Sequence, residues 1–150
     1  MGIKPVASDI LNLSEKYKNF YHAIIKFIPE ARVFADPIRT LAYGTDASFY
    51  RMLPKLVIKV DTPEEMSTIL QIAHKLTVPV TFRAAGTSLS GQSITDSVLL
   101  VATHGWSKYS ISADGGLISL EPGIIGSEAN DYLKPYARKI GPDPATINNA

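Results

Sequence analysis

The chain has 150 residues and a net charge of +1, from 15 basic and 14 acidic side chains. This balance excludes the strongly basic surface of a nucleic-acid-binding protein, and the absence of cysteine excludes disulfides and cysteine-ligated metal sites. No apolar run approaches the roughly 20 residues that span a bilayer, and residues 1–12 lack the apolar stretch of a signal peptide. We therefore expect a cytoplasmic protein without a nucleic-acid partner, and one large enough to bury a core.

The N-terminal part of the chain predicts one helix followed by a long loop. Aromatic and aliphatic residues recur every three or four positions over residues 14–27, which is typical of a helix with one buried face. Ser14 is a suitable N-cap, and Pro29 stops the helix. Residues 29–54 contain prolines and a glycine but little periodicity, so we expect them to be mostly loop.

A β-α-β unit follows. Apolar residues alternate over residues 56–60, which predicts a strand buried on at least one face. Thr62, Pro63 and Glu65 then have the types and spacing of an N-cap, a first helical residue and a capping box. The helix is followed by strands over residues 78–82 and 97–102. We expect the two strands that flank the helix to be parallel neighbours, joined by a right-handed crossover.

The last third of the chain predicts a hairpin and a helix. Residues 109–112 and 117–121 are strand-like and flank the turn Asp114-Gly115-Gly116. Residues 127–138 have helical spacing, and we expect this helix to end at Gly141.

The loop between the second and third strands of the β-α-β region carries the most specific chemistry. After Arg83, residues 84–93 are almost entirely Gly, Ala, Ser and Thr. Glycines reach positive φ and small side chains allow a close approach, so the backbone N–H groups of such a loop can surround an anion. We therefore predict a phosphate or pyrophosphate cradle. The alternative is an ordinary strand connection, in which Thr87, Ser88 and Ser90 bond their own backbone.

Two familiar phosphate motifs fit this loop poorly. A dinucleotide fingerprint needs a further glycine at the right spacing and a helix directly after the loop. Gly86, Gly91 and Ser93 match the pattern of a P-loop, but Gln92 replaces its lysine and a strand follows. A nucleoside triphosphatase is therefore the weakest hypothesis.

Five segments, in the same order along the chain, resemble the FAD-binding domain of the vanillyl-alcohol-oxidase or PCMH type. Within that superfamily they look like the branch of D-lactate dehydrogenase and the glycolate oxidase flavin subunit. The segments are residues 82–91, Tyr43 to Tyr50 with Pro54, residues 57–65, Ile118 to Gly123 with its Glu121-Pro122-Gly123, and residues 141–150.

The resemblance covers residues 36–150 and implies an α+β fold. We expect half of a PCMH-type domain, with a small β-α-β sheet and an antiparallel hairpin, preceded by a helical extension over residues 1–35. In the family the chain continues past Ala150, so we expect an N-terminal fragment of a longer flavoprotein. Residues 141–150 are most similar to long members that carry an iron–sulfur region downstream.

The resemblance also implies the cofactor-binding residues, because the family's loop holds the pyrophosphate of FAD and its proline-aspartate segment contacts the flavin. The expected residues are Arg83, Ala84, Ala85, Gly86, Thr87, Ser88, Leu89, Ser90, Gly91, Gln92, Ser93, Pro142 and Asp143. Some relatives attach FAD through a histidine in this loop. Since this loop has none, we expect non-covalent FAD. His22, His74 and His104 lack metal-site spacing, and we expect them to be structural or solvated.

Enzymes of this branch oxidise D-2-hydroxy acids such as D-lactate or glycolate to 2-oxo acids, and the flavin accepts the hydride. The resemblance therefore implies an FAD-dependent oxidoreductase that, at full length, uses a hydroxy acid and an electron acceptor. For the full-length protein, a peripheral position at the inner face of the membrane is an alternative to a free cytoplasmic one. Catalytic residues would lie beyond residue 150, so we expect this fragment to be inactive and to self-associate through exposed apolar surface. The alternatives are an oxidase of the same fold that acts on an alditol, a phenol or another alcohol, and a non-enzymatic binding module without flavin.

Overall fold

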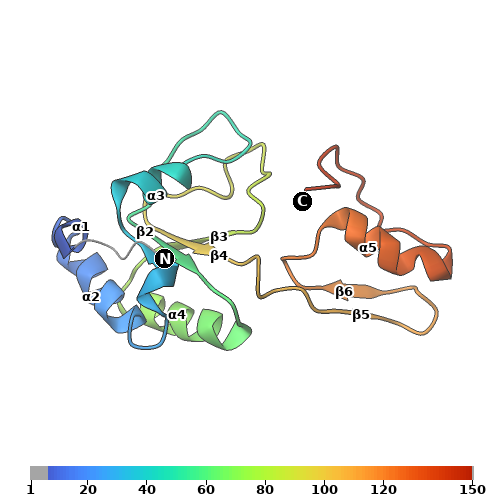
Figure 1. Ribbon diagram of the computed structural model, residues 1–150, viewed down its shortest axis with the longest axis horizontal. Coiled ribbons are helices and arrows are strands. Elements are labelled where there is room, and N and C mark those ends of the chain that lie inside the picture. The colour runs from blue at the N-terminus through green and yellow to red at the C-terminus, as the bar shows by residue number, and fades with distance from the viewer. Residues whose placement is uncertain (1–6, 150) are drawn as a thin grey trace.

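The structure is a computed structural model that describes residues 7–149. Residues 1–6, which belong to the expected helical extension, and Ala150, the last residue of the family-like segment, lie outside the described residues. Figure 1 shows two lobes joined by the stretch of chain that leads from β4 to β5. The first lobe holds a four-stranded sheet with helices on both sides, and the second holds a hairpin with one helix against it.

The elements follow one another as an α+β chain. They are α1 (Ala7–Leu11), α2 (Glu15–Ile24), the 3-10 turn η1 (Glu30–Arg32), β1 (Val33–Phe34), α3 (Pro37–Ala42), β2 (Leu56–Lys59), α4 (Pro63–Lys75), β3 (Val80–Arg83), β4 (Val98–Val101), β5 (Tyr109–Ile111), β6 (Ile118–Leu120), α5 (Gly126–Leu133) and the 3-10 turn η2 (Lys134–Tyr136).

The strand order of the sheet corrects one prediction. The order is β1-β2-β4-β3, so the two strands that flank α4 are parallel but are not neighbours. Strand β4 lies between them because all four of its residues are apolar and buried, and only a central strand buries both faces. Strand β3 takes the edge, where Phe82 leaves 54% of its surface exposed.

Residues 29–54 are mostly loop, as predicted, but they also contain the short elements β1 and α3. Val33 and Phe34 pair antiparallel with Ile58 and Val57 of β2. Helix α3 begins after Asp36, whose carboxylate accepts a hydrogen bond from the Arg39 N–H at 2.9 Å. Elements of two and six residues are too short to produce a periodic pattern, so the sequence did not reveal them.

The predicted helix start at residue 63 is confirmed, but two helix ends were misplaced. Thr62 caps α4, and its hydroxyl oxygen accepts a hydrogen bond from the Glu65 N–H at 3.2 Å. Helix α2 ends at Ile24 rather than at residue 27. Helix α5 ends at Leu133 and gives way to η2, where Ala137, not Gly141, adopts the left-handed conformation with φ 52°.

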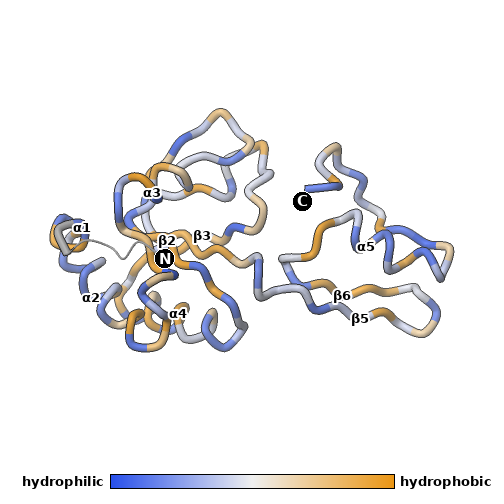
Figure 2. Tube along the Cα trace, viewed as in Figure 1, coloured by the Kyte–Doolittle hydropathy of each residue, from blue (hydrophilic) through white to orange (hydrophobic). Residues whose placement is uncertain are grey.

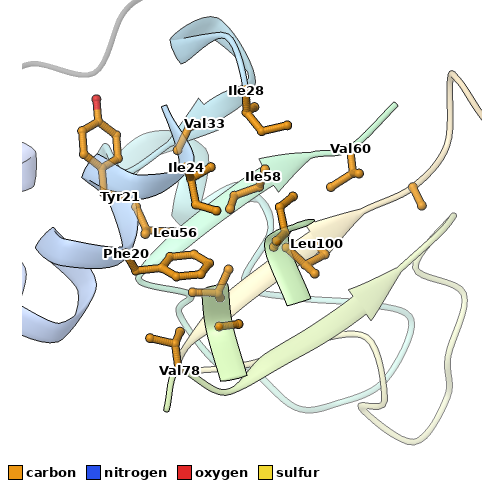
Figure 3. Packing of buried hydrophobic residues seen from close by; sticks show 14 of the residues in the cluster. Phe20, Tyr21, Ile24, Ile28, Val33, Leu56, Ile58, Val60, Val78 and Leu100 are labelled. Atoms are coloured by element: carbon orange, nitrogen blue, oxygen red, sulfur yellow. The ribbon is translucent and has the colours of Figure 1, made fainter. Parts of the chain in front are cut away.

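The main core lies between the sheet and helices α2 and α4. Figure 3 shows Phe20 and Ile24 of α2 directed towards Leu56 and Ile58 of β2. In Figure 2 the apolar colour concentrates on the strands of the first lobe. Side chains of the expected N-terminal extension therefore share one core with the family-like region, while the domain boundary at residue 35 stays a prediction.

The second lobe is smaller and more open. Its hairpin is antiparallel, as predicted, and contacts α5 through Tyr109 and Tyr132, whose rings stack with centroids 4.0 Å apart. Leu117 and Leu120 of the hairpin remain exposed, and self-association through this surface stays a prediction. Within residues 7–149, no helix combines the length and the apolar character needed to cross a membrane.

Candidate cofactor site

A cavity of about 530 Å³ lies between the two lobes. Its first wall consists of residues 82–88 with Gln92 and Ser93, and its second wall consists of Thr103, His104 and residues 122–125, with Asn149 beside them. The volume falls within the range of about 300–1,000 Å³ for small-molecule sites. The cavity lies at the carboxyl ends of β3 and β4, which is where parallel sheets bind ligands.

Gly86 shapes the first wall. Its φ of +75° lies in the left-handed region that favours glycine, and Gly91 has a similar value of +72°. A methyl group on Gly86 would lie 2.6 Å from Cζ of Arg83. The backbone therefore passes directly over the guanidinium group, and a side chain at this position would have to displace it.

Arg83 connects this wall to a distant segment. Its Nη1 donates to the carbonyl oxygen of Thr45 at 2.7 Å and to that of Tyr43 at 3.5 Å. Its guanidinium also lies over the Tyr43 ring, 5.5 Å from the centroid. Arg83 thus links the loop to residues 43–45 and also lines the cavity. Its contact with a phosphate stays a prediction.

Asp46 secures the other end of the loop. Its Oδ2 accepts hydrogen bonds from the hydroxyl of Ser93 at 3.0 Å and from the Ser93 N–H at 3.4 Å, while Oδ1 accepts from the Ser48 N–H at 2.9 Å. Although burial acts to raise its pKa, these hydrogen bonds lower the pKa of Asp46 to about 2. The Ala47 N–H donates to the Gly86 carbonyl oxygen at 3.1 Å. Residues 43–48 therefore support the loop along its length.

Ser88 bonds the backbone of its own loop, which was the alternative to a phosphate cradle in the sequence analysis. Its hydroxyl oxygen accepts hydrogen bonds from the N–H groups of Ser90 at 3.2 Å and Gln92 at 3.1 Å. This turn folds the loop tip back on itself. Ser88 also lines the cavity, so a turn and a cradle are compatible in this loop.

The structure brings eight of the thirteen predicted site residues to the cavity, namely Arg83, Ala84, Ala85, Gly86, Thr87, Ser88, Gln92 and Ser93. The lining does not include Leu89, Ser90, Gly91, Pro142 or Asp143. Leu89 is 78% exposed, and a methyl group on Gly91 would lie 3.0 Å from the Tyr50 ring. The carboxylate of Asp143 accepts a hydrogen bond from Lys139 at 3.5 Å.

The second wall contains residues that the predicted site left out. Pro122 and Gly123 had a signal, since Glu121-Pro122-Gly123 is part of the family-like pattern, but they were not assigned to the site. His104, expected to be structural or solvated, is exposed and lines the cavity. No sequence signal pointed to His104, because it approaches the loop only through the tertiary arrangement of the two lobes. Among the described residues, no three His, Asp or Glu side chains form a group that would hold a metal ion.

Comparison with known proteins identifies the family. Residues 54–150 match the family model described as an FAD binding domain. The chain belongs to this family. It is 29% identical over 127 residues to glycolate oxidase subunit GlcD of Escherichia coli (strain K12), an alignment that covers 83% of this chain and 26% of the relative. It is 27% identical over 114 residues to D-2-hydroxyglutarate dehydrogenase of the same strain, covering 73% of this chain and 11% of the relative.

The fold agrees with the family. The chain superposes on p-cresol methylhydroxylase with a TM-score of 0.68 at 12% identity, over 85% of this chain and 26% of that one. The predicted fold class, part of a PCMH-type FAD-binding domain with a mixed sheet and a hairpin, is therefore confirmed. The chain is thus an FAD-binding domain of the kind found in flavin oxidoreductases, and it spans about a quarter of the glycolate oxidase subunit.

Proposed function

We propose that the cavity between the lobes binds FAD non-covalently, with its diphosphate against residues 84–93. The observation that carries this proposal is the first wall itself, which consists of backbone and small side chains around Gly86. A methyl group on Gly86 would lie 2.6 Å from Cζ of Arg83, so glycine lets the loop backbone lie directly against the guanidinium group at the cavity wall. The described residues therefore fit a diphosphate in a chain that belongs to an FAD-binding family.

The residues of this chain bind and orient the cofactor in this proposal. The N–H groups of residues 84–88, which line the cavity, and the Thr87 hydroxyl donate to the diphosphate, and Arg83 contributes positive charge beside it. The ionised carboxylate of Asp46 accepts hydrogen bonds from Ser48 and Ser93, and these hydrogen bonds hold the loop. When bound, FAD supplies the acceptor for a hydride from the alcohol carbon of a substrate. Residues 84–93 contain neither histidine nor cysteine, which supports non-covalent binding.

We further propose that the full-length protein is an oxidoreductase that converts a D-2-hydroxy acid to a 2-oxo acid and passes electrons to an acceptor. The support is that relatives of 27–29% identity are named for glycolate and D-2-hydroxyglutarate. Substrate-binding and proton-accepting residues would lie outside the described residues. An iron–sulfur region downstream and a cytoplasmic location are part of the same proposal.

A flavin titration tests the cofactor proposal. FAD, FMN and riboflavin are added separately to the protein, and quenching of flavin fluorescence gives the three affinities. Because riboflavin lacks the diphosphate and loses several charge-assisted hydrogen bonds, we expect it to bind at least about 100-fold more weakly than FAD. Equal affinities, or no binding of FAD, would overturn the cradle. Release of all bound flavin on acid precipitation tests the non-covalent assignment.

A substrate panel tests the enzyme proposal on the full-length protein. Reduction of a dye acceptor is followed with D-lactate, glycolate, D-2-hydroxyglutarate, xylitol and 4-ethylphenol. Turnover restricted to the hydroxy acids supports the proposal. Turnover of the alditol or the phenol alone would replace the substrate class, and the absence of both bound FAD and turnover would favour the non-enzymatic binding module without flavin.

A further inference from the structure

The two lobes meet where residues 103–106 cross residues 122–123, a region that we call the crossing. We propose that the crossing is a rigid joint that sets the separation of the two cavity walls, and that Trp106, Gly105 and Gly123 are positioning residues for the cofactor. The identity of the ligand rests on the proposed function, but the joint itself does not.

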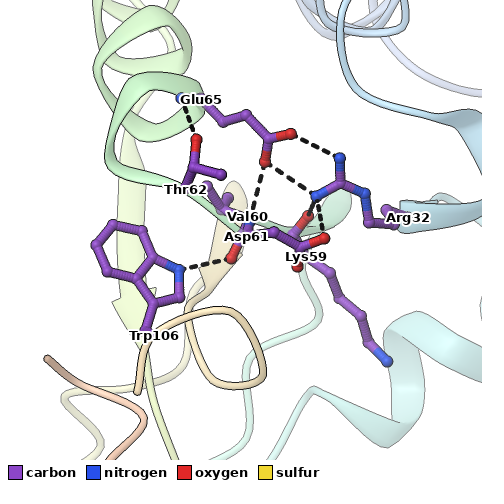
Figure 4. A network of polar contacts seen from close by, with 7 residues as sticks. All are labelled: Arg32, Lys59, Val60, Asp61, Thr62, Glu65 and Trp106. Carbon is purple, nitrogen blue, oxygen red and sulfur yellow. Dashed lines mark hydrogen bonds and ion pairs between the residues drawn. The ribbon is translucent and has the colours of Figure 1, made fainter. Parts of the chain in front are cut away.

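Trp106 fixes the crossing to the first lobe. It is the chain's single tryptophan, and its buried ring packs in the main core near Val60 and Ala102. Its Nε1 donates to the carbonyl oxygen of Val60 at 2.7 Å, as Figure 4 shows. The Val60 N–H in turn donates to the Val101 carbonyl oxygen at 2.9 Å. The indole is therefore hydrogen-bonded directly to the carboxyl end of the sheet.

Gly105 brings the crossing into direct contact with Asp61. A methyl group on Gly105 would overlap the Asp61 carbonyl group and would lie 2.9 Å from its carbon. The backbone of Asp61 cannot readily move away, because its N–H donates to Glu65 Oε2 at 2.9 Å and its carboxylate pairs with Arg32 at 2.7 Å. The backbones of Gly105 and Asp61 are therefore in contact, and neither can shift to admit a side chain at position 105.

Arg32 and Glu65 complete this support. Nη2 of Arg32 lies 2.6 Å from Glu65 Oε1, and Nη1 donates to Glu65 Oε2 at 2.9 Å, which makes a two-pronged ion pair (Figure 4). The hydrogen bonds from Arg32 hold the pKa of Glu65 below its usual range. Both side chains are about one-fifth exposed, so solvent screens the pair only in part. The network therefore connects η1 and the start of α4 to Asp61, the residue that Gly105 contacts.

Gly123 connects the crossing to the rest of the second cavity wall. Its N–H donates to the Trp106 carbonyl oxygen at 2.9 Å. A methyl group on Gly123 would overlap the carbonyl oxygens of Thr103 and Trp106 and would lie 3.1 Å from the Thr103 carbonyl carbon. Gly123 and Thr103 both line the second wall, and Ala102, which precedes Thr103, donates its N–H to the carbonyl oxygen of Arg83 in the first wall at 2.9 Å. A displacement of Gly123 relative to Thr103 therefore moves residues 122–125 relative to the first wall.

The contacts form an unbroken series from Arg32 to Gly123. Close-packed regions transmit displacement rather than absorbing it, and two glycines occupy the points where a single methyl group does not fit. A ligand that touches both walls benefits from this rigidity, because walls held at the correct separation need no ordering when the ligand binds.

A distance measurement tests the joint independently of any ligand. The chain has no cysteine, so cysteines introduced at exposed Gln71 on α4 and at exposed Ala113 in the hairpin turn accept one spin label each. Gly123→Ala is compared with Gly141→Ala, where an added methyl group meets nothing within 4 Å. We expect one narrow distance distribution in the parent and in Gly141→Ala, and a shifted or broadened one in Gly123→Ala. An unchanged distribution in Gly123→Ala would overturn the joint.

FAD affinity tests the positioning role. A displacement of about 1 Å in a site can cost up to 100-fold in function, and we expect Gly123→Ala to weaken FAD binding at least tenfold while Gly141→Ala leaves it unchanged. A shifted distance with unchanged affinity would overturn the positioning role and leave the joint standing. If the parent binds no FAD, the proposed function fails, and the distance measurement still decides the joint.

A second variant covers the case in which Gly123→Ala does not fold. Trp106→Phe keeps an aromatic ring in the core but removes the Nε1–H donor to Val60. We expect the same broadening and a smaller loss of FAD affinity. A Trp106→Phe protein with the parent's distance distribution and affinity would contradict the proposal.

Discussion

Replacing Gly86 with alanine tests the coupling between the loop and Arg83. A non-glycine residue in the left-handed region costs about 1–2 kcal/mol. The new methyl group would lie 2.6 Å from Cζ of Arg83, so the guanidinium must move away from the Thr45 carbonyl oxygen that it contacts at 2.7 Å. A hydrogen bond from a charged group is worth about 1.5–3 kcal/mol. We therefore expect Gly86→Ala to lower the free energy of unfolding by about 3 kcal/mol.

A double-mutant cycle with Arg83→Ala separates the two contributions. Without the guanidinium, the methyl group at position 86 has no such neighbour, and only the conformational cost of about 1–2 kcal/mol remains. The two substitutions should therefore be less costly together than the sum of the single effects, by about 2 kcal/mol. Coupling of this size is expected only for groups in direct contact.

Urea unfolding measures all four free energies, followed by the fluorescence of Trp106, which lies in the core of the first lobe. Gly141→Ala is the matched control, because its methyl group meets nothing within 4 Å. Additive effects within about 0.5 kcal/mol would refute the contact between Gly86 and Arg83. So would a cost below about 1 kcal/mol for Gly86→Ala alone.

Three further predictions concern stability. The pKa of Asp46 is about 2 in the folded chain and about 3.9 when unfolded. Its contribution to the free energy of unfolding is therefore complete above pH ~4 and is lost as the pH falls towards 2. The urea midpoint should drop less between pH 6 and pH 3 in Asp46→Asn than in the parent, and equal drops would contradict this. Thr77 is β-branched with φ 54°, so Thr77→Gly should raise the free energy of unfolding by about 1 kcal/mol, and a loss would show that the strain is absent. Leu100 is fully buried and Leu117 is 68% exposed; thermal and urea unfolding should give a cost of about 2–5 kcal/mol for Leu100→Ala and under about 0.5 kcal/mol for Leu117→Ala, and similar costs would place the core elsewhere.

Elements with strong local signals were predictable. Helix α4 begins at Pro63 because Thr62 caps it and proline suits its first position, and both signals lie within a few residues. The hairpin follows from a turn in which Gly115 adopts φ +66°. The strand order was not predictable in this way. Strand β4 lies between β2 and β3 because of burial on both faces, which depends on elements distant in the sequence.

The candidate site divides along the same line. Sequence alone determined the composition of the first wall, because the small residues around Gly86 are consecutive and their backbone freedom is a local property. The hydrogen bond from Arg83 to Thr45 and those from Ser93 to Asp46 became evident only from the folded chain. Only the tertiary structure decided that residues 122–125 form the opposite wall. These contacts join segments far apart in the chain, and their geometry arises from the packing of whole elements, which no local pattern encodes.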